Sequence, residues 1–181
     1  MKVTPQAIPD VLLLEPQVFQ DARGFLLESF HLARFESAIG RAAPFVQDNH
    51  SRSQRSVLRG LHYQATQPQG KLVRVTRGEV FDVAVDLRRS SPTFGRWTGC
   101  ILNESLHQQL WIPEGFAHGF LVLSESADVL YKTTAYWAPA DERCIVWNDA
   151  DLAIAWPLNG EARISEKDAR GLSFRAAPHY P

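Results

Sequence analysis

Short segments with the composition of β-strands dominate this sequence and limit the folds it can form. Runs rich in Val, Leu, Phe, Tyr and Thr recur between Gly, Pro, Asp and Ser residues, a pattern typical of short strands joined by turns. We predict strands at Val11–Leu14, Gly24–Phe30, Phe45–Ser51, Val57–Gln64, Lys71–Arg77, Glu79–Leu87, Gly95–Leu102, Gln108–Ile112, Ala117–Leu123 and Asp128–Tyr136. About ten short strands with few helices favour two packed antiparallel sheets, a sandwich or jelly roll.

Two local patterns add detail. In Glu79–Leu87, one strand face carries Phe81, Val83, Val85 and Leu87, and the other carries Asp82, Ala84 and Asp86. Gly78, between two predicted strands, indicates a tight hairpin turn.

Helical periodicity is scarce. We predict one helix over His31–Ile39, ended by Gly40, and a second short helix that begins near Ser165 as its N-cap. The chain has no repeat and no long linker, so residues 1–181 are expected to form a single domain.

Charge and composition exclude several classes of protein. The formal net charge of −1 provides no basic field for nucleic acid or an anionic membrane. The first residues lack the apolar stretch of a signal peptide, and no apolar run approaches the ~20 residues of a membrane span. Cys100 and Cys144 lack CxxC spacing and are expected to be free thiols. These features favour a cytoplasmic protein.

The segment Val57–Gln64 contains the first candidate for catalysis. His62 can take and give a proton near neutral pH, although a lone histidine in a strand is more often a structural core residue. Arg59 favours a functional site, because its guanidinium is costly to bury without an anion. In a regular strand Arg59 and His62 point to opposite faces, so we predict a bulge at Gly60 that brings both to one side.

A second segment, Trp111–Phe120, contains Pro113, Gly115 and His118 in the spacing PxGxxH, which resembles the second half-motif of the cupin superfamily. Metal-binding cupins add a His-x-His pair and a Glu from the first half-motif, but here Tyr63 and Gln64 follow His62. A catalytic zinc or iron site normally needs about three protein ligands. Metal-free chemistry is therefore favoured, unless an unrecognised carboxylate completes the set.

A third segment, Ala127–Trp137, contains Tyr131 on a predicted strand face. Such a tyrosine is usually a core residue, but a phenol with an available proton can act as a general acid opposite a histidine base. The chain has no GxGxxG and no P-loop motif, so side chains must hold any nucleotide.

Taken in order, these segments resemble the dTDP-4-dehydrorhamnose 3,5-epimerase family over almost the whole chain. The matching stretches are Asp21–Glu28, Phe45–Ser53, Val57–Gln64, Gln69–Val75, Phe81–Arg88, Ser91–Gly95, Trp111–Phe120, Leu130–Lys132 and Ser165–Asp168. The resemblance implies an all-β, cupin-type double-stranded β-helix, a jelly-roll barrel with a few short peripheral helices.

The resemblance also implies the reaction. The family inverts C3 and C5 of dTDP-4-dehydro-6-deoxy-D-glucose to give dTDP-4-dehydro-L-rhamnose, in dTDP-L-rhamnose biosynthesis. Both carbons flank the C4 ketone, so removing either proton gives an enolate, and returning a proton to the other face inverts the centre. This chemistry needs a base, an acid and a donor near the C4 oxygen, but no cofactor.

By the same resemblance, His62 is the base, Asp168 its carboxylate partner, Tyr131 the acid, and Lys71 the cation near the C4 oxygen. The residues that hold the dTDP-4-keto-6-deoxy sugar are Arg23, Glu28, Gln47, Asn49, Arg59, Lys71, His118, Glu142 and Lys167. In the family, N-terminal strands reach across a homodimer, so Arg23 and Glu28 are expected to serve the partner's site. One departure is Tyr136–Trp137, where the family is expected to have two tyrosines.

Three alternatives stay open. A mono-epimerase that acts at C3 or C5 only would use the same acid–base residues. A metal-dependent cupin enzyme would reveal itself in a metal analysis. A non-catalytic sugar-binding module would keep its affinity for the sugar after His62 is replaced.

Overall fold

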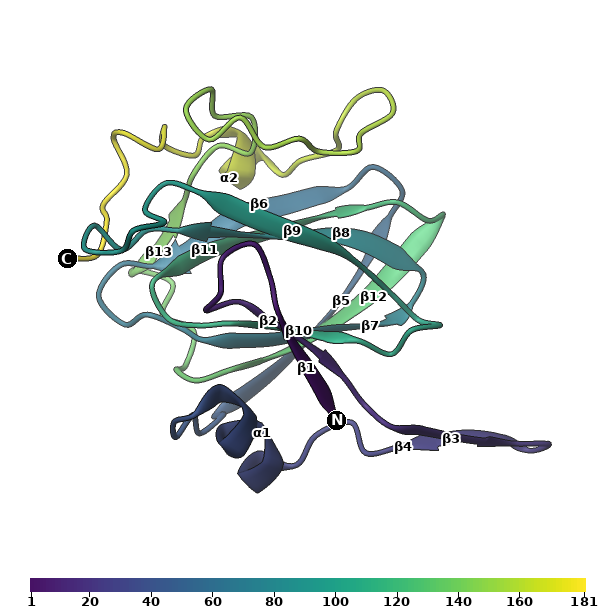
Figure 1. The fold of residues 1–181 in the computed structure, drawn as a ribbon. Helices are drawn as coiled ribbons and strands as arrows, with labels where there is room; N and C mark the ends of the chain where they lie inside the picture. The colour runs from purple at the N-terminus through teal and green to yellow at the C-terminus, as the bar shows by residue number, and fades with distance from the viewer.

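Two antiparallel β-sheets face each other and form the body of the molecule (Figure 1). The computed structural model describes all residues from Met1 to Pro181. The six-stranded sheet has the order β1 (Lys2–Pro5), β2 (Leu12–Glu15), β10 (Gln109–Ile112), β7 (Lys71–Arg77), β12 (Ser126–Thr133) and β5 (Gln47–Gln54). The five-stranded sheet has the order β13 (Glu142–Cys144), β6 (Leu58–Gln64), β11 (Phe116–Val122), β8 (Glu79–Asp86) and β9 (Trp97–Asn103). The prediction of two packed antiparallel sheets is confirmed.

Each of the ten predicted segments overlaps a strand, although most of the bounds differ by one to three residues. Three strands were not predicted, namely β1, β3 (Val18–Asp21) and β13. β1 includes a proline, and β13 has only three residues with the sequence Glu-Arg-Cys. Both are short strands at sheet edges that carry no alternating apolar pattern, so pairing with a neighbouring strand, β2 or β6, determines them rather than their own sequence.

The predicted hairpin at Gly78 is wrong. β7 and β8 lie in different sheets, so the chain crosses from one sheet to the other at this residue. A single residue is too short for the usual two-residue hairpin loop. Gly78 has φ +74°, and a Cβ there would lie 2.0 Å from the backbone oxygen of Ser126. Glycine is therefore required at position 78. Its role is to let the chain cross between the sheets rather than to form a hairpin.

The core lies mainly between the two sheets. Strand β8 packs apolar side chains into a hydrophobic cluster on each of its two faces. Val80 and Ala84 pack in the cluster between the sheets, whereas Val83, Val85 and Leu87 pack on the outer face beneath C-terminal residues such as Leu152. The predicted alternation of β8 is therefore confirmed. Its acidic positions face inward, where Asp82 and Asp86 are fully buried.

The two predicted helices are confirmed. Helix α1 (Leu32–Ile39) begins after His31, whose Nδ1 accepts from the backbone N–H of Arg34, and ends at Gly40 with φ 73°. Helix α2 (Glu166–Ala169) begins after Ser165, whose hydroxyl accepts from the backbone N–H of Asp168 at 3.0 Å. Figure 1 places α2 above β6, on the opposite side of the molecule from α1. No helix has the length and apolar character needed to span a bilayer.

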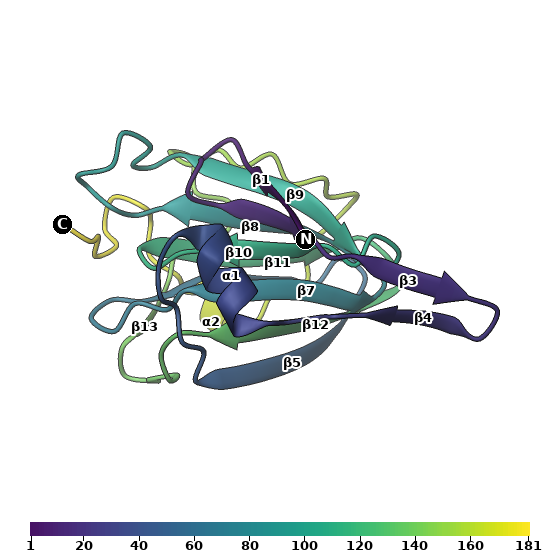
Figure 2. The same cartoon turned by 60° about the horizontal axis from the view of Figure 1, so that its bottom comes forward.

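A hairpin of β3 and β4 (Gly24–Leu27) extends away from the two sheets (Figures 1 and 2). Its apolar side chains are exposed: Phe19 by 58%, Phe25 by 59% and Leu26 by 73%. Such a group of large apolar side chains in water is typical of a surface that another chain covers.

Candidate active site

A cavity of about 620 Å³ opens between the two sheets, close to α2. This volume is within the range of sites that bind small organic ligands. Most of the predicted site residues line it: Gln47, Asn49, Arg59, His62, Lys71, His118, Tyr131, Glu142, Lys167 and Asp168. The structure therefore brings together residues from strands β5, β6, β7, β11, β12 and β13 and from helix α2.

His62 and Asp168 form a hydrogen-bonded pair at one wall of the cavity. His62 Nε2 lies 2.7 Å from Asp168 Oδ1, and the backbone N–H of Gly60 donates to Asp168 Oδ2 at 3.2 Å. Burial opposes ionisation of Asp168, but the hydrogen bonds and charge of these neighbours outweigh it and lower the pKa of the carboxyl. An ionised carboxylate only accepts, so Nε2 carries the proton and leaves Nδ1 as the basic nitrogen.

The predicted bulge at Gly60 is confirmed. Opposite β11, His62 pairs with His118 but Arg59 pairs with Phe120, so β6 contains one extra residue between the two pairs. Gly60 has φ +116°, and a Cβ there would lie 2.7 Å from the Cα of Gly119. The bulge places both Arg59 and His62 on the cavity side.

Lys71 lies deep in the cavity wall and is 7% exposed. Its Nζ donates to the backbone oxygen of His62 at 3.3 Å. Burial lowers the pKa of Lys71 to about 8, while the negative charges of Glu142 and Asp82 act in the opposite direction. The ammonium is therefore largely retained at neutral pH, next to a polar cavity in which new negative charge would be stabilised.

Tyr131 projects from β12 into the cavity and pairs across the sheet with Asn49. Burial, and then the charge of Glu142, raises the pKa of its phenol, while Arg59 acts in the opposite direction. The hydroxyl thus holds its proton at neutral pH. It makes no hydrogen bond within the chain, unlike the hydroxyls of Tyr63 and Tyr180, which donate to backbone oxygens.

A second His–Asp pair faces the same cavity, and sequence reasoning missed its acidic member. His118 Nε2 lies 3.0 Å from both carboxylate oxygens of Asp82, which is fully buried. Burial lowers the pKa of His118, Asp82 opposes this, and Lys71 and His62 add to it. Asp82 orients the His118 ring from behind. The available signal was an acidic residue in the middle of a strand with apolar residues on either side.

Glu142 links two other residues that line the cavity, Trp137 and Lys167. It accepts from Trp137 Nε1 at 3.2 Å and pairs with Lys167. Burial alone would raise the pKa of Glu142, but these two hydrogen bonds lower it. Trp137 also donates its backbone N–H to Gln47 Oε1 at 2.9 Å. Trp137 and Arg163 both line the cavity as well.

Two predicted substrate-binding residues lie away from the cavity. Arg23, at the turn of the projecting hairpin, has a side chain that is 90% exposed and is paired with Asp21 at 2.6 Å. Glu28 is paired with Arg34 at 2.8 Å. Within one chain, neither residue can contact a ligand held by His62.

Cys100 and Cys144 are free thiols, as expected. One group of side chains has the composition of a metal site. His62, Cys144 and Asp168 each offer one ligand atom, and these atoms lie within 4.8 Å of one another.

Comparison with known proteins identifies relatives over the whole chain. Residues 5–176 match the family model described as dTDP-4-dehydrorhamnose 3,5-epimerase. The chain is 62% identical over 181 residues to the dTDP-4-dehydrorhamnose 3,5-epimerase of Pseudomonas aeruginosa, covering 100% of both chains.

Solved structures agree. A dTDP-6-deoxy-D-glucose-3,5-epimerase from Legionella pneumophila, in complex with dTDP-4-keto-L-rhamnose, superposes with a TM-score of 0.96 at 49% identity, covering 99% of this chain and 98% of that one. A 3′-monoepimerase from Streptomyces bikiniensis, in complex with dTDP-quinovose, superposes with a TM-score of 0.89 at 34% identity, covering 94% of this chain and 86% of that one.

Proposed function

Because this chain belongs to the dTDP-4-dehydrorhamnose 3,5-epimerase family, we propose that its cavity inverts C3 and C5 of dTDP-4-dehydro-6-deoxy-D-glucose to give dTDP-4-dehydro-L-rhamnose. The protein is an isomerase with a cupin-type barrel and acts in dTDP-L-rhamnose biosynthesis. The observation that carries the proposal is the His62–Asp168 pair in one cavity with Tyr131 and Lys71. We place the reaction in the cytoplasm, consistent with the free thiols of Cys100 and Cys144.

The proposed reaction uses these four side chains in sequence. His62 Nδ1 removes the proton from C3 or C5, and the electrons of the C–H bond move to the C4 oxygen as an enolate forms. The Lys71 ammonium stabilises that oxygen, and Asp168 stabilises the imidazolium. Tyr131 then donates its proton to the opposite face of the carbon, and the carbonyl re-forms. Proton exchange with solvent restores both groups before the second centre reacts.

The remaining cavity residues hold the substrate. We assign the diphosphate to Arg59, because a guanidinium pairs well with phosphate oxygens. Gln47, Asn49 and His118 offer hydrogen bonds to the sugar or the base. Glu142 and Lys167 complete the binding set at the cavity mouth, where they pair with each other.

We further propose a homodimer in which the β3–β4 hairpin reaches the partner's cavity. The exposed Phe19, Phe25 and Leu26 would be covered in such a dimer, and Arg23 and Glu28 would then approach a substrate held by the other chain. Light scattering should give twice the mass of the chain. A monomer with full activity would contradict this arrangement.

The function is tested by isotope incorporation. With the dTDP-4-keto-6-deoxyglucose substrate in D₂O, we expect deuterium at both C3 and C5 and inversion of both centres. Deuterium and inversion at only one carbon would instead identify a mono-epimerase. The 62% identity to a 3,5-epimerase, against 34% to a 3′-monoepimerase, supports the first outcome. If neither C3 nor C5 exchanged its proton, the result would contradict an epimerase of any kind.

Removal of metal is expected to leave turnover unchanged. The proposed steps use only protein acids and bases, and Lys71 supplies the positive charge at the C4 oxygen. The measurement is the rate after extensive dialysis against chelator, with metal content determined in the same sample. A rate that falls and returns only with zinc, iron or manganese would contradict this mechanism.

A further inference from the structure

We propose that His62 Nε2, Cys144 Sγ and Asp168 Oδ1 form an inhibitory binding site for one thiophilic divalent cation, such as zinc or cadmium. The site lies behind the His62 ring. Cys144 is not among the residues that line the cavity, and it faces Asp168 from β13. The binding of the cation is independent of the proposed function, whereas its inhibitory effect rests on the role of His62 as the base.

The three ligand atoms already have nearly the separations that a tetrahedral cation requires. Zinc bonds of about 2.0–2.3 Å put neighbouring ligand atoms roughly 3.3–3.6 Å apart. Here Cys144 Sγ lies 3.9 Å from Asp168 Oδ1, His62 Nε2 lies 2.7 Å from the same oxygen, and all three atoms lie within 4.8 Å of one another. The largest separation, at most 4.8 Å, would have to shorten by up to about 1.3 Å to reach the ideal value of roughly 3.5 Å and admit a cation.

The surroundings hold the ligands in place. β13 pairs with β6 so that Cys144 and His62 are direct neighbours across the strands. The second oxygen of Asp168 accepts the backbone N–H of Gly60, and the N-cap contact of Ser165 fixes the start of α2. Such outer contacts orient metal ligands and typically contribute about 10–100-fold to affinity.

The chemistry of the donor set selects the cation. One imidazole, one thiolate and one carboxylate suit zinc or cadmium rather than magnesium or calcium, which prefer oxygen ligands. Cys144 is only 9% exposed, so a cation must form a strong bond to sulfur to displace the thiol proton in this buried position. With one thiolate and one carboxylate, a divalent cation gives a neutral site, which suits a buried position.

Binding at this site removes the base without filling the cavity. The thiol proton of Cys144 leaves to solvent as the metal–sulfur bond forms. The proton on His62 Nε2 must also leave that nitrogen, and the neutral ring then carries it on Nδ1. Nδ1 is the atom proposed to accept the substrate proton. Zinc should therefore lower kcat and leave KM unchanged, once zinc bound by the substrate diphosphate is allowed for.

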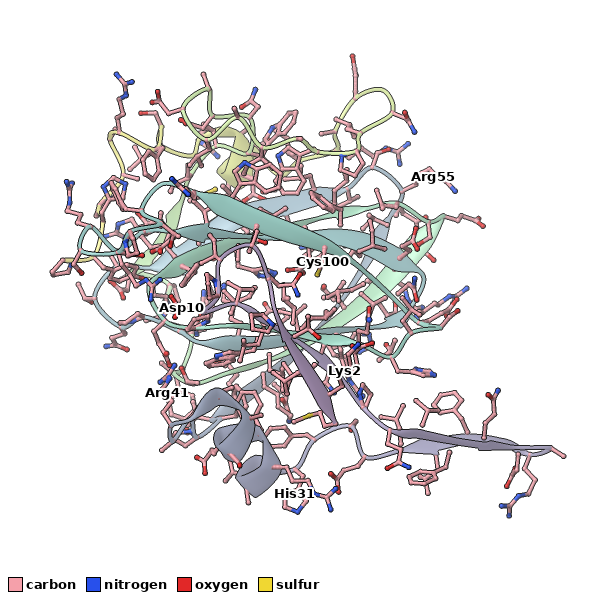
Figure 3. All side chains as sticks on the ribbon, viewed as in Figure 1. Lys2, Asp10, His31, Arg41, Arg55 and Cys100 are labelled. Carbon is pink, nitrogen blue, oxygen red and sulfur yellow. The ribbon has the colours of Figure 1, made fainter.

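The test compares two single-thiol variants of the full-length protein. Cys144→Ser removes the proposed ligand, and Cys100→Ser removes the other thiol, on β9 between the sheets (Cys100 is labelled in Figure 3). Cadmium titration should produce one thiolate-to-metal absorption band per chain in the wild type and in Cys100→Ser, but none in Cys144→Ser. The zinc concentration for half-inhibition, normalised to each variant's own metal-free rate, should rise at least about tenfold in Cys144→Ser alone.

Several results would overturn the proposal. They are the absence of a cadmium band in the wild type, loss of the band in Cys100→Ser, and equal zinc sensitivity of Cys144→Ser and wild type. If Cys144→Ser fails to fold, Cys144→Ala and the wild-type kcat and KM under zinc serve the same purpose, and purely competitive inhibition contradicts the site. Cadmium binding at Cys144 in a protein without epimerase activity would overturn the proposed function and leave the metal site intact.

Discussion

Replacing His62 by alanine is expected to lower turnover by at least about 10²–10⁴-fold, the usual contribution of general acid–base catalysis. Asp168 holds the His62 imidazole at 2.7 Å with Nδ1 free to accept a proton, whereas the other imidazole of the cavity, His118, is buried against Asp82. Asp168→Ala should also lower turnover strongly, but less, because an unoriented imidazole still works poorly as a base. The measurement is steady-state turnover with folding checked by a melting curve.

The molecule offers a matched control for this pair. His50 Nε2 lies 3.5 Å from Asp128 Oδ2, but the His50 side chain is 57% exposed and does not line the cavity. His50→Ala also removes a histidine beside an aspartate, so its turnover should remain near that of wild type. A His62→Ala enzyme within about tenfold of wild type, well short of an acid–base contribution, would remove His62 from the mechanism.

Replacing Tyr131 by phenylalanine is expected to reduce inversion more than proton exchange. The change keeps the ring and deletes only the transferable proton, while His62 can still remove protons from C3 and C5. The enolate would then be reprotonated mainly from the histidine face, which returns the original configuration. In D₂O, the mutant should still incorporate deuterium at a reduced rate, and the loss of inversion should be larger. NMR measures both rates in one sample.

Tyr180→Phe is the control for a purely structural tyrosine. Its hydroxyl donates to the backbone oxygen of Gln64 and does not face the cavity. Loss of that hydrogen bond should cost about 1 kcal/mol of stability, with exchange and inversion changing together. If Tyr131→Phe behaves in this way, Tyr131 is a core residue and another group supplies the proton.

Much of the fold was predictable from the sequence because the signals are local. A strand of alternating residues, such as β8, and a helix with His31 before it and Gly40 after it are recognisable within a few residues. The bulge at Gly60 was also predictable, since Arg59 and His62 needed a common face and glycine permits the required backbone. β13 was not predictable, because three polar and small residues become a strand only through pairing with β6.

The site itself depended on contacts between distant parts of the chain. From the sequence alone, Asp168 is explained as an acidic residue in the first turn of α2. Only the placement of α2 above β6 brings its carboxylate to His62. The alternation of β8 does not say which of its two faces points into the molecule. Only the fold shows that Asp82 points inward and pairs with His118. Arg23 and Glu28 matched the family by sequence, yet the fold of one chain leaves them outside the cavity.

By itself, the sequence determined ten of the thirteen strands, both helices, the bulge in β6 and, through the resemblance, the family. Only the tertiary structure decided that Gly78 changes sheets, that Asp82 supports His118, and that Cys144 lies beside the His62–Asp168 pair. The physical reason is the range of the interactions. Backbone preferences and side-chain alternation act over a few residues, whereas hydrogen bonds and buried charges depend on which strands pair across the two sheets.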